Sequence, residues 1–175
     1  MTVSKIKSLS FIIMFSFLVY GSCLAQEGYE DISKIGFIKN DGANVRAGDN
    51  VNFTSLCKLE DGDPVKVIGK RYSWYKILLP EKAHVYIKGD FVEIIPDQEE
   101  AGINASNVNL RAGPGTKYAI VGQVSKPDKI HIVAEEENAW YKITPPKNIA
   151  GWVHSSQLRF STEKSAPEEE IKDKE

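Results

Sequence analysis

The stretch NVRAG at residues 44–48 returns as NLRAG at residues 109–113, and WYKI at residues 74–77 returns unchanged at residues 140–143. The order and spacing of these segments are the same in both copies, with one extra residue in the second copy ahead of its tryptophan. Several matches in register over a long period are the signature of a duplicated structural unit. The chain is therefore expected to contain the same small fold twice.

Each copy covers about sixty residues, at positions 35–95 and 101–160. The segment IPDQEE at residues 95–100 separates them, and its Pro96 cannot join a central strand ladder. We therefore expect a domain boundary at this linker. A unit of this length buries little surface, so packing of the two copies against each other would help to stabilise them.

Alternation of apolar and polar side chains predicts strands within each copy. VKV at residues 65–67 and IHI at residues 130–132 place their aliphatic side chains on one face. In both WYKI segments the tyrosine and isoleucine share one face, while the tryptophan and lysine share the other. Turn residues such as GPG at 113–115 separate the strands. Short strands at close spacing predict an all-β chain that forms two small barrels or sandwiches.

The first residues have the layout of a secretory signal peptide. Two lysines precede an apolar run at residues 8–20, and Cys23, Leu24 and Ala25 follow it as a short segment of small and apolar residues. The run is shorter than the roughly 20 residues that span a bilayer. We therefore expect residues 1–25 to be removed, which leaves an extracytoplasmic protein without a transmembrane anchor.

Lipid attachment at Cys23 is the alternative to cleavage after Ala25. The segment GSC at residues 21–23 is similar to the end of a bacterial lipobox. Tyr20, however, stands where that motif has an aliphatic residue.

The charge of the chain argues against one class of partner, and the composition of its last residues predicts disorder. The formal net charge is −2 at pH 7, so the chain offers no basic field for nucleic acid. Residues 161–175 (STEKSAPEEEIKDKE) are charged and almost without apolar side chains, which predicts a disordered acidic tail. Residues 26–33 are expected to form a loose leader.

The repeated segments resemble the bacterial SH3-like (SH3b) domain family. The second copy carries NLRAGPG, WYKI and then GWV at residues 151–153; the first has DN at 49–50 and VYI at 85–87 in the corresponding places. The resemblance implies two tandem, partly open barrels of five to six strands each. It also implies a binding role in the cell envelope, with cell-wall peptides, proteins or other envelope molecules as ligands.

No combination of residues in the sequence indicates catalysis, a metal site or a cofactor. Cys57 aligns with a glycine of the other copy and is interpreted as a small buried hydrophobe. His84, His131 and His154 occupy unrelated repeat positions and lack metal-ligand spacing. We therefore expect a protein that is not an enzyme.

The candidate ligand-binding residues are aromatic. Trp140 and Trp152 are predicted to point outward on neighbouring strands, and their counterparts in the first copy are Trp74 and Tyr86. Outward rings on a small barrel either meet a ligand or cover a neighbouring loop or domain. Both alternatives stay open from the sequence.

The repeated arginines and glycines are expected to be structural. Arg46 and Arg111 are predicted to donate hydrogen bonds to loop carbonyls, with a ligand carboxylate as the alternative partner. Gly48 and Gly113 are expected to need either a positive φ or a close backbone approach.

These observations favour a non-catalytic envelope-binding protein whose tandem modules hold a cell-wall peptide or another envelope ligand. The alternative is a protein–protein adaptor in the envelope that does not bind the cell wall.

Overall fold

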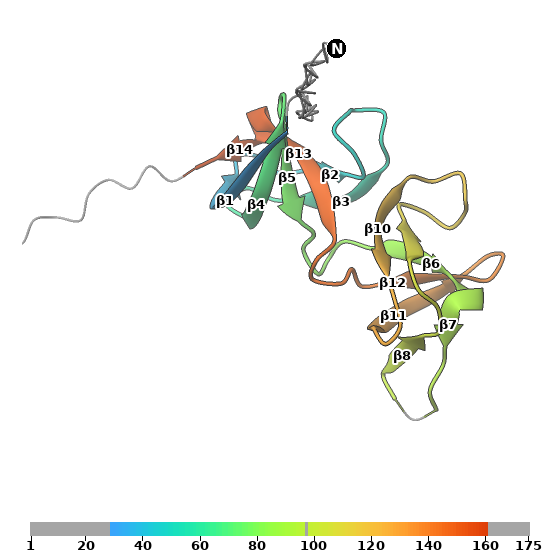
Figure 1. Ribbon diagram of the computed structural model, residues 1–175. Coiled ribbons are helices and arrows are strands. Elements are labelled where there is room, and N and C mark those ends of the chain that lie inside the picture. The colour runs from blue at the N-terminus through green and yellow to red at the C-terminus, as the bar shows by residue number, and fades with distance from the viewer. Residues whose placement is uncertain (1–28, 97, 161–175) are drawn as a thin grey trace, which may run out of the picture.

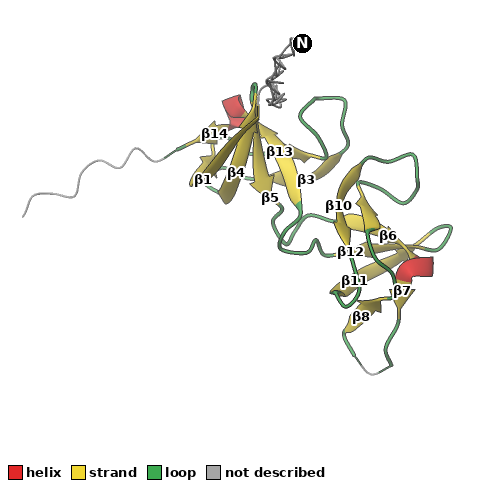
Figure 2. Ribbon diagram, viewed as in Figure 1, coloured by secondary structure: helices red, strands yellow, loops and turns green. Residues whose placement is uncertain are grey.

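The computed structural model describes residues 29–96 and 98–160, whose regular elements are almost all strands. The expected signal peptide at 1–25 and acidic tail at 161–175 lie outside the described residues. Two short 3-10 helices, Gly89–Phe91 and Ser155–Gln157, are the red segments in Figure 2. No helix in the described part is long and apolar enough to cross a membrane. The expectation of an all-β chain with two small barrel-like units is confirmed.

The strands form two antiparallel sheets of seven strands each (Figure 1). Each sheet curls around its own core, and we call the two units the first and second barrels. The first sheet has the order β14-β1-β4-β5-β13-β2-β3, from β1 (Tyr29–Ile38), β2 (Ala43–Arg46), β3 (Ser55–Leu59), β4 (Pro64–Arg71), β5 (Trp74–Leu78), β13 (Ala150–His154) and β14 (Leu158–Arg159). The second has the order β10-β9-β6-β12-β11-β8-β7, from β6 (Val85–Lys88), β7 (Val92–Glu93), β8 (Glu100–Ile103), β9 (Val108–Arg111), β10 (Ile120–Val124), β11 (Lys129–Glu136) and β12 (Trp140–Ile143).

Each sheet contains strands from both sequence repeats. β13 belongs to the second repeat but lies between β5 and β2 of the first, with Trp152 opposite Lys76. β6 belongs to the first repeat but lies between β12 and β9 of the second, with Tyr86 opposite Lys142. In Figure 1 the orange β13 runs among the blue and green strands, and the green β6 lies among yellow and orange ones. The two repeats have therefore exchanged their last strands.

The expectation that residues 35–95 and 101–160 each close their own sheet is wrong. The strands of the first barrel come from residues 29–78 and 150–159, and those of the second come from residues 85–143. β5 and β12 both contain the sequence WYKI, so the sequence of these two strands does not indicate which of them pairs with β6 and which with β13. A second difference is that β1 starts at Tyr29, within the segment expected to be a loose leader.

The exchanged strands contribute to the core of the barrel that they join. Val153 and Leu158 are buried with the first core, and Val85 and Ile87 are buried with the second. Burial of one such side chain stabilises a fold by about 1.5–3 kcal/mol. Val153, which follows the half-buried Trp152 in the second repeat, is thus buried in the core of the first barrel.

Two crossing segments connect the barrels and contact each other. The backbone N–H of Leu79 donates to the carbonyl of Ile149 over 2.9 Å. The Leu79 side chain packs against both cores, while Ile149 is buried in the second. Each segment makes a turn at the same repeat position, where Pro80 and Pro146 accept a hydrogen bond from the residue three positions later.

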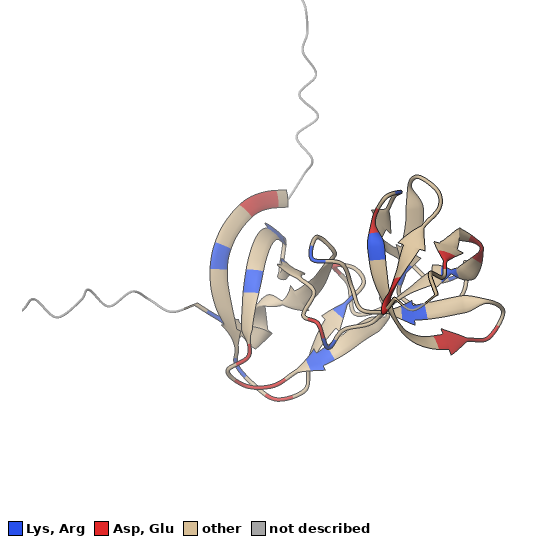
Figure 3. Cartoon of the chain, turned by 90° about the horizontal axis from the view of Figure 1, so that it is seen from below, with Lys and Arg blue, Asp and Glu red and all other residues tan. Residues whose placement is uncertain are grey.

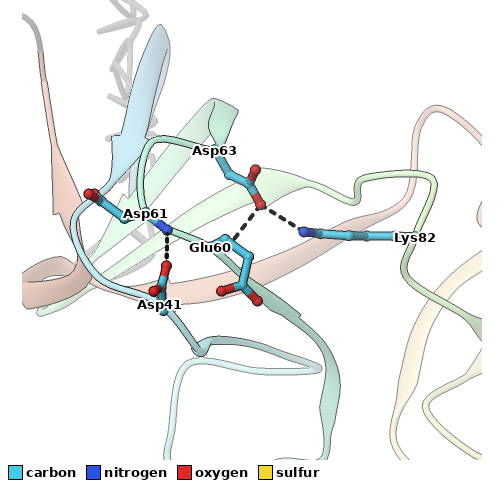
Figure 4. Close-up of polar contacts among 5 residues, drawn as sticks. All are labelled: Asp41, Glu60, Asp61, Asp63 and Lys82. Carbon is cyan, nitrogen blue, oxygen red and sulfur yellow. Dashed lines mark hydrogen bonds and ion pairs between the residues drawn. The ribbon is translucent and has the colours of Figure 1, made fainter.

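Lys82 attaches the first crossing segment to the turn between β3 and β4 (Figure 4). Its Nζ lies 2.7 Å from Oδ2 of Asp63, which also accepts from the backbone N–H of Glu60 over 3.0 Å. The hydrogen bond between the two side chains is the main cause that lowers the pKa of Asp63 and raises the pKa of Lys82. Both groups are partly exposed, so the pair orients the crossing segment more than it stabilises the fold.

Strand exchange should keep the two repeats together after the linker is cut. We expect a chain with a protease site inserted at residues 97–99 to elute as one species after cleavage, because each half supplies a strand to the other's sheet. Size-exclusion chromatography before and after cleavage, with a urea-treated sample as the control for complete cutting, measures this. Two separate peaks without denaturant would contradict the exchanged topology.

Candidate binding cleft

The loops after β2 and β9 are held by equivalent arginines. Arg46 Nη1 donates to the carbonyl of Phe53 over 2.9 Å, and Arg111 Nη1 donates to that of Tyr118 over 2.8 Å. Each acceptor lies seven residues after its arginine. The guanidinium–carbonyl contact expected from the sequence is thus present in both repeats, and it fixes the loops rather than opening them to a ligand.

The ring of the same aromatic residue lies over the loop glycine. A Cβ atom on Gly48 would come within 2.5 Å of the Phe53 ring, and one on Gly113 within 2.6 Å of the Tyr118 ring. Neither glycine has a positive φ. Of the two reasons expected for these glycines, the close approach therefore applies.

The exchange separates the two tryptophans that the sequence places on one face. Trp152 lies in the first sheet, whereas Trp140 lies in the second, opposite Lys88. Trp140 is only 6% exposed, so the prediction that it points into solvent is wrong. It lines a cavity of about 150 Å³ together with Phe91 and Arg111. These two residues come from other segments, and the alternation within the strand of Trp140 could not predict them.

The first-copy counterparts are also split between the barrels. Trp74 is half-buried in the first sheet, with its ring edge-on to His154 at a centroid distance of 5.2 Å. Tyr86 is half-buried in the second sheet, opposite Arg111. Burial is the main cause that raises the pKa of Tyr86, and the nearby charge of Glu136 adds to it.

Trp152 lines a different cavity, which we call the Trp152 cleft. It measures about 300 Å³, and its lining residues come from β1, β4, β5 and β13: Tyr29, Arg71, Lys76 and Trp152. Lys76 Nζ lies 5.7 Å from the ring centroid of Tyr29 and 5.9 Å from that of Trp152. The ammonium group therefore lies within cation–π range of both rings.

Gly69 makes room for the tyrosine of this cleft. A Cβ atom on Gly69 would come within 2.7 Å of Cζ of Tyr29, so the ring lies directly against the backbone of β4. Gly69 is opposite Lys76 in the first barrel, and Ala134 is opposite Lys142 at the equivalent position of the second. The described part of the second barrel has no strand corresponding to residues 29–34, so the cleft belongs to the first barrel.

Three of the four lining residues were not predicted from the sequence. Tyr29 fell in the expected leader, and Arg71 has no repeated counterpart that would draw attention to it. Lys76 could have been found, because strand alternation places it on the same face as the tryptophan of its segment.

Cys57 is held in its unreactive, protonated form. Burial is the largest of the effects that raise the pKa of its thiol to about 11. The thiolate is the nucleophilic form of cysteine, so almost none is present at neutral pH. In the described part of the chain, no group of three or more His, Cys, Asp or Glu side chains could hold a metal ion.

Both sequence repeats match one known protein family. The family model described as "Bacterial SH3 domain" matches residues 41–93 and 106–159, both within the sequence repeats. No curated protein matches. A solved structure, "Structure of NlpC2 from Trichomonas vaginalis", aligns at 13% identity with a TM-score of 0.23. The alignment covers 75% of this chain and 49% of that one, so the match spans about half the length of that structure.

The state of Cys57 predicts slow alkylation. In a chain that lacks Cys23, we expect iodoacetamide at pH 8 to modify the native protein at least about tenfold more slowly than the urea-unfolded protein, because the raised pKa leaves little thiolate. Mass spectrometry over time measures both rates. Native modification as fast as in urea would show an accessible, activated thiol.

Proposed function

Because this chain belongs to the bacterial SH3 domain family, we propose that it is a non-catalytic, exported protein that binds a cell-wall component through the Trp152 cleft. The two family matches cover more than half of the sequence and confirm the resemblance of both repeats. Domains of this family are commonly cell-wall-binding modules. The ligand and the site on this chain are our proposal.

The Trp152 cleft is the observation on which the proposal rests. The indole is half-buried rather than covered, and it faces a cavity that also holds a second ring and two cations. Aromatic-lined grooves on SH3-like barrels bind extended peptides, because flat rings supply contact area at little cost in side-chain entropy. A volume of about 300 Å³ is near the lower limit for ligand sites, which suits one or two residues of a peptide.

The chemistry of the remaining groups supports a binding role. The thiol with the raised pKa is a poor nucleophile. The three histidines expected to be non-catalytic come from three different segments: a crossing segment (His84), β11 (His131) and β13 (His154). The signal-peptide pattern at residues 1–25 supports export.

The ring of Trp152 should contribute a large part of the affinity. We expect the mature protein to be retained by purified cell-wall sacculi, and Trp152→Ala to weaken retention at least about tenfold, because a truncated aromatic anchor typically costs 2 kcal/mol or more. Ile120→Ala is the control, since Ile120 is 51% exposed on β10 of the other barrel. Thermal melting of each variant checks that the fold is kept.

The outcomes separate the two candidate functions. Retention that falls for Trp152→Ala but not for Ile120→Ala supports the proposal. If Trp152→Ala melts like the parent and is retained equally well, the site is wrong. If the parent protein is not retained at all, cell-wall binding is wrong, and the adaptor alternative becomes the hypothesis to test.

A further inference from the structure

The two barrels carry opposite charges at the same place in the fold. Arg71 ends β4 and lies opposite Trp74, while Glu136 ends β11 and lies opposite Trp140. Since Trp74 and Trp140 are the same repeat position, Arg71 and Glu136 are structural equivalents. An arginine thus lines the Trp152 cleft where the second barrel has a glutamate.

The neighbouring position shows the same reversal. Lys70 is opposite Tyr75 in the first barrel, and Glu135 is opposite Tyr141 in the second. Figure 3 shows blue segments across the strands of the first barrel and a red strand end in the second. The strand that pairs with the Trp-Tyr segment therefore ends in Lys-Arg in the first barrel and in Glu-Glu in the second.

Glu136 is close enough to affect the ring that corresponds to Trp152. Tyr86 occupies the position of Trp152, since each lies opposite a lysine, Lys142 or Lys76 respectively. The charge of Glu136 contributes to the raised pKa of Tyr86. The second barrel therefore already has a carboxylate beside the ring, where the first barrel has cations.

The net charge of the cleft suits a single carboxylate. Arg71 forms an ion pair with Asp49 at 3.4 Å, and its side chain is 45% exposed, so its guanidinium keeps donors for a ligand. Lys76 forms no ion pair within residues 29–96 and 98–160. Burial raises the pKa of Tyr29, and the charge of nearby Asp31 adds to it, so Asp31 is a second acid beside the cleft. The two cations are balanced by Asp49 and Asp31, and such a site accepts a single carboxylate better than a doubly charged phosphate.

We propose that the Trp152 cleft selects the carboxylate of a cell-wall peptide, and that the second barrel, with Glu136 in the equivalent place, does not bind it. This inference rests on the proposed cell-wall binding and names the chemistry of its ligand. The carboxylate lies between Arg71 and Lys76, and the adjoining peptide packs on the Trp152 ring. One chain therefore holds one peptide, although it carries two modules.

The first test changes the ligand. The mature protein is titrated onto untreated sacculi, onto sacculi treated with hydrofluoric acid to remove phosphate polymers, and onto sacculi whose carboxylates are converted to methylamides. We expect the acid treatment to leave binding unchanged and amidation to weaken it about fivefold or more, because charge pairing is lost. A loss on acid treatment would overturn the inference in favour of phosphate.

The second test changes the protein at matched positions. We expect Arg71→Glu to weaken binding to untreated sacculi at least about fivefold, and Glu136→Arg to leave it at or above the parent level. Lys76→Gln should weaken binding without adding a negative charge. Thermal melting again separates loss of binding from loss of fold.

The two proposals fail in different ways. If the sacculi do not retain the parent protein, the proposed function fails. If retention is strong but unaffected by amidation, Arg71→Glu and Lys76→Gln, only the carboxylate inference is wrong. If Glu136→Arg is retained at or above the parent level while Arg71→Glu is not, binding depends on the first barrel, as the inference requires.

Discussion

The backbone hydrogen bonds between β5 and β13 join strands from different repeats, and the Trp152 cleft depends on them. The register places Trp152 of the second repeat directly opposite Lys76 of the first. Gly151, the preceding residue, allows this close pairing, because a Cβ there would come within 2.6 Å of Val45 and within 2.8 Å of Leu79. Without the exchange, the indole would lie beside Lys142 and Glu136, in a cleft of different charge.

The same exchange couples the stability of the two barrels. A unit of about sixty residues buries too little surface to be very stable alone. Here the first core needs Val153 from the second repeat, and the second core needs Val85 and Ile87 from the first. The Leu79 side chain contacts both cores at the crossing point. Because neither sheet is complete without the other repeat, the two barrels should unfold together in one cooperative transition rather than independently.

Sequence reasoning predicted the elements well because alternation reports directly on burial. Val65, Val67 and Ile77 are buried as expected, and the repeated arginines make the same contact twice. The exchange could not be predicted, because the backbone N–H and C=O groups along a strand edge are the same whichever repeat supplies the neighbouring strand. The prediction for Trp140 was wrong for a different reason. Strand alternation predicts on which face of the sheet a side chain lies, but it does not predict which loops cover that face.

The cleft itself was only partly predictable. Trp152 was found because strand alternation predicts that it points outward. Tyr29 lies far from it in the sequence and reaches it only through the long strand β1. Arg71 became meaningful only when strand pairing identified Glu136 as its equivalent. The charge reversal between the two barrels is a property of their paired strands and has no counterpart in the shared sequence motifs.

Backbone nuclear Overhauser effects across the strand at residues 150–154 test the exchanged pairing most directly, because paired strands bring backbone protons of opposite residues close together. In the isotope-labelled protein, the exchanged topology predicts cross-peaks from Trp152 and Val153 to Lys76 and Tyr75. Cross-peaks from the same two residues to residues 141–142 would show that each repeat closes its own barrel, and would contradict both the exchange and the cleft built on it.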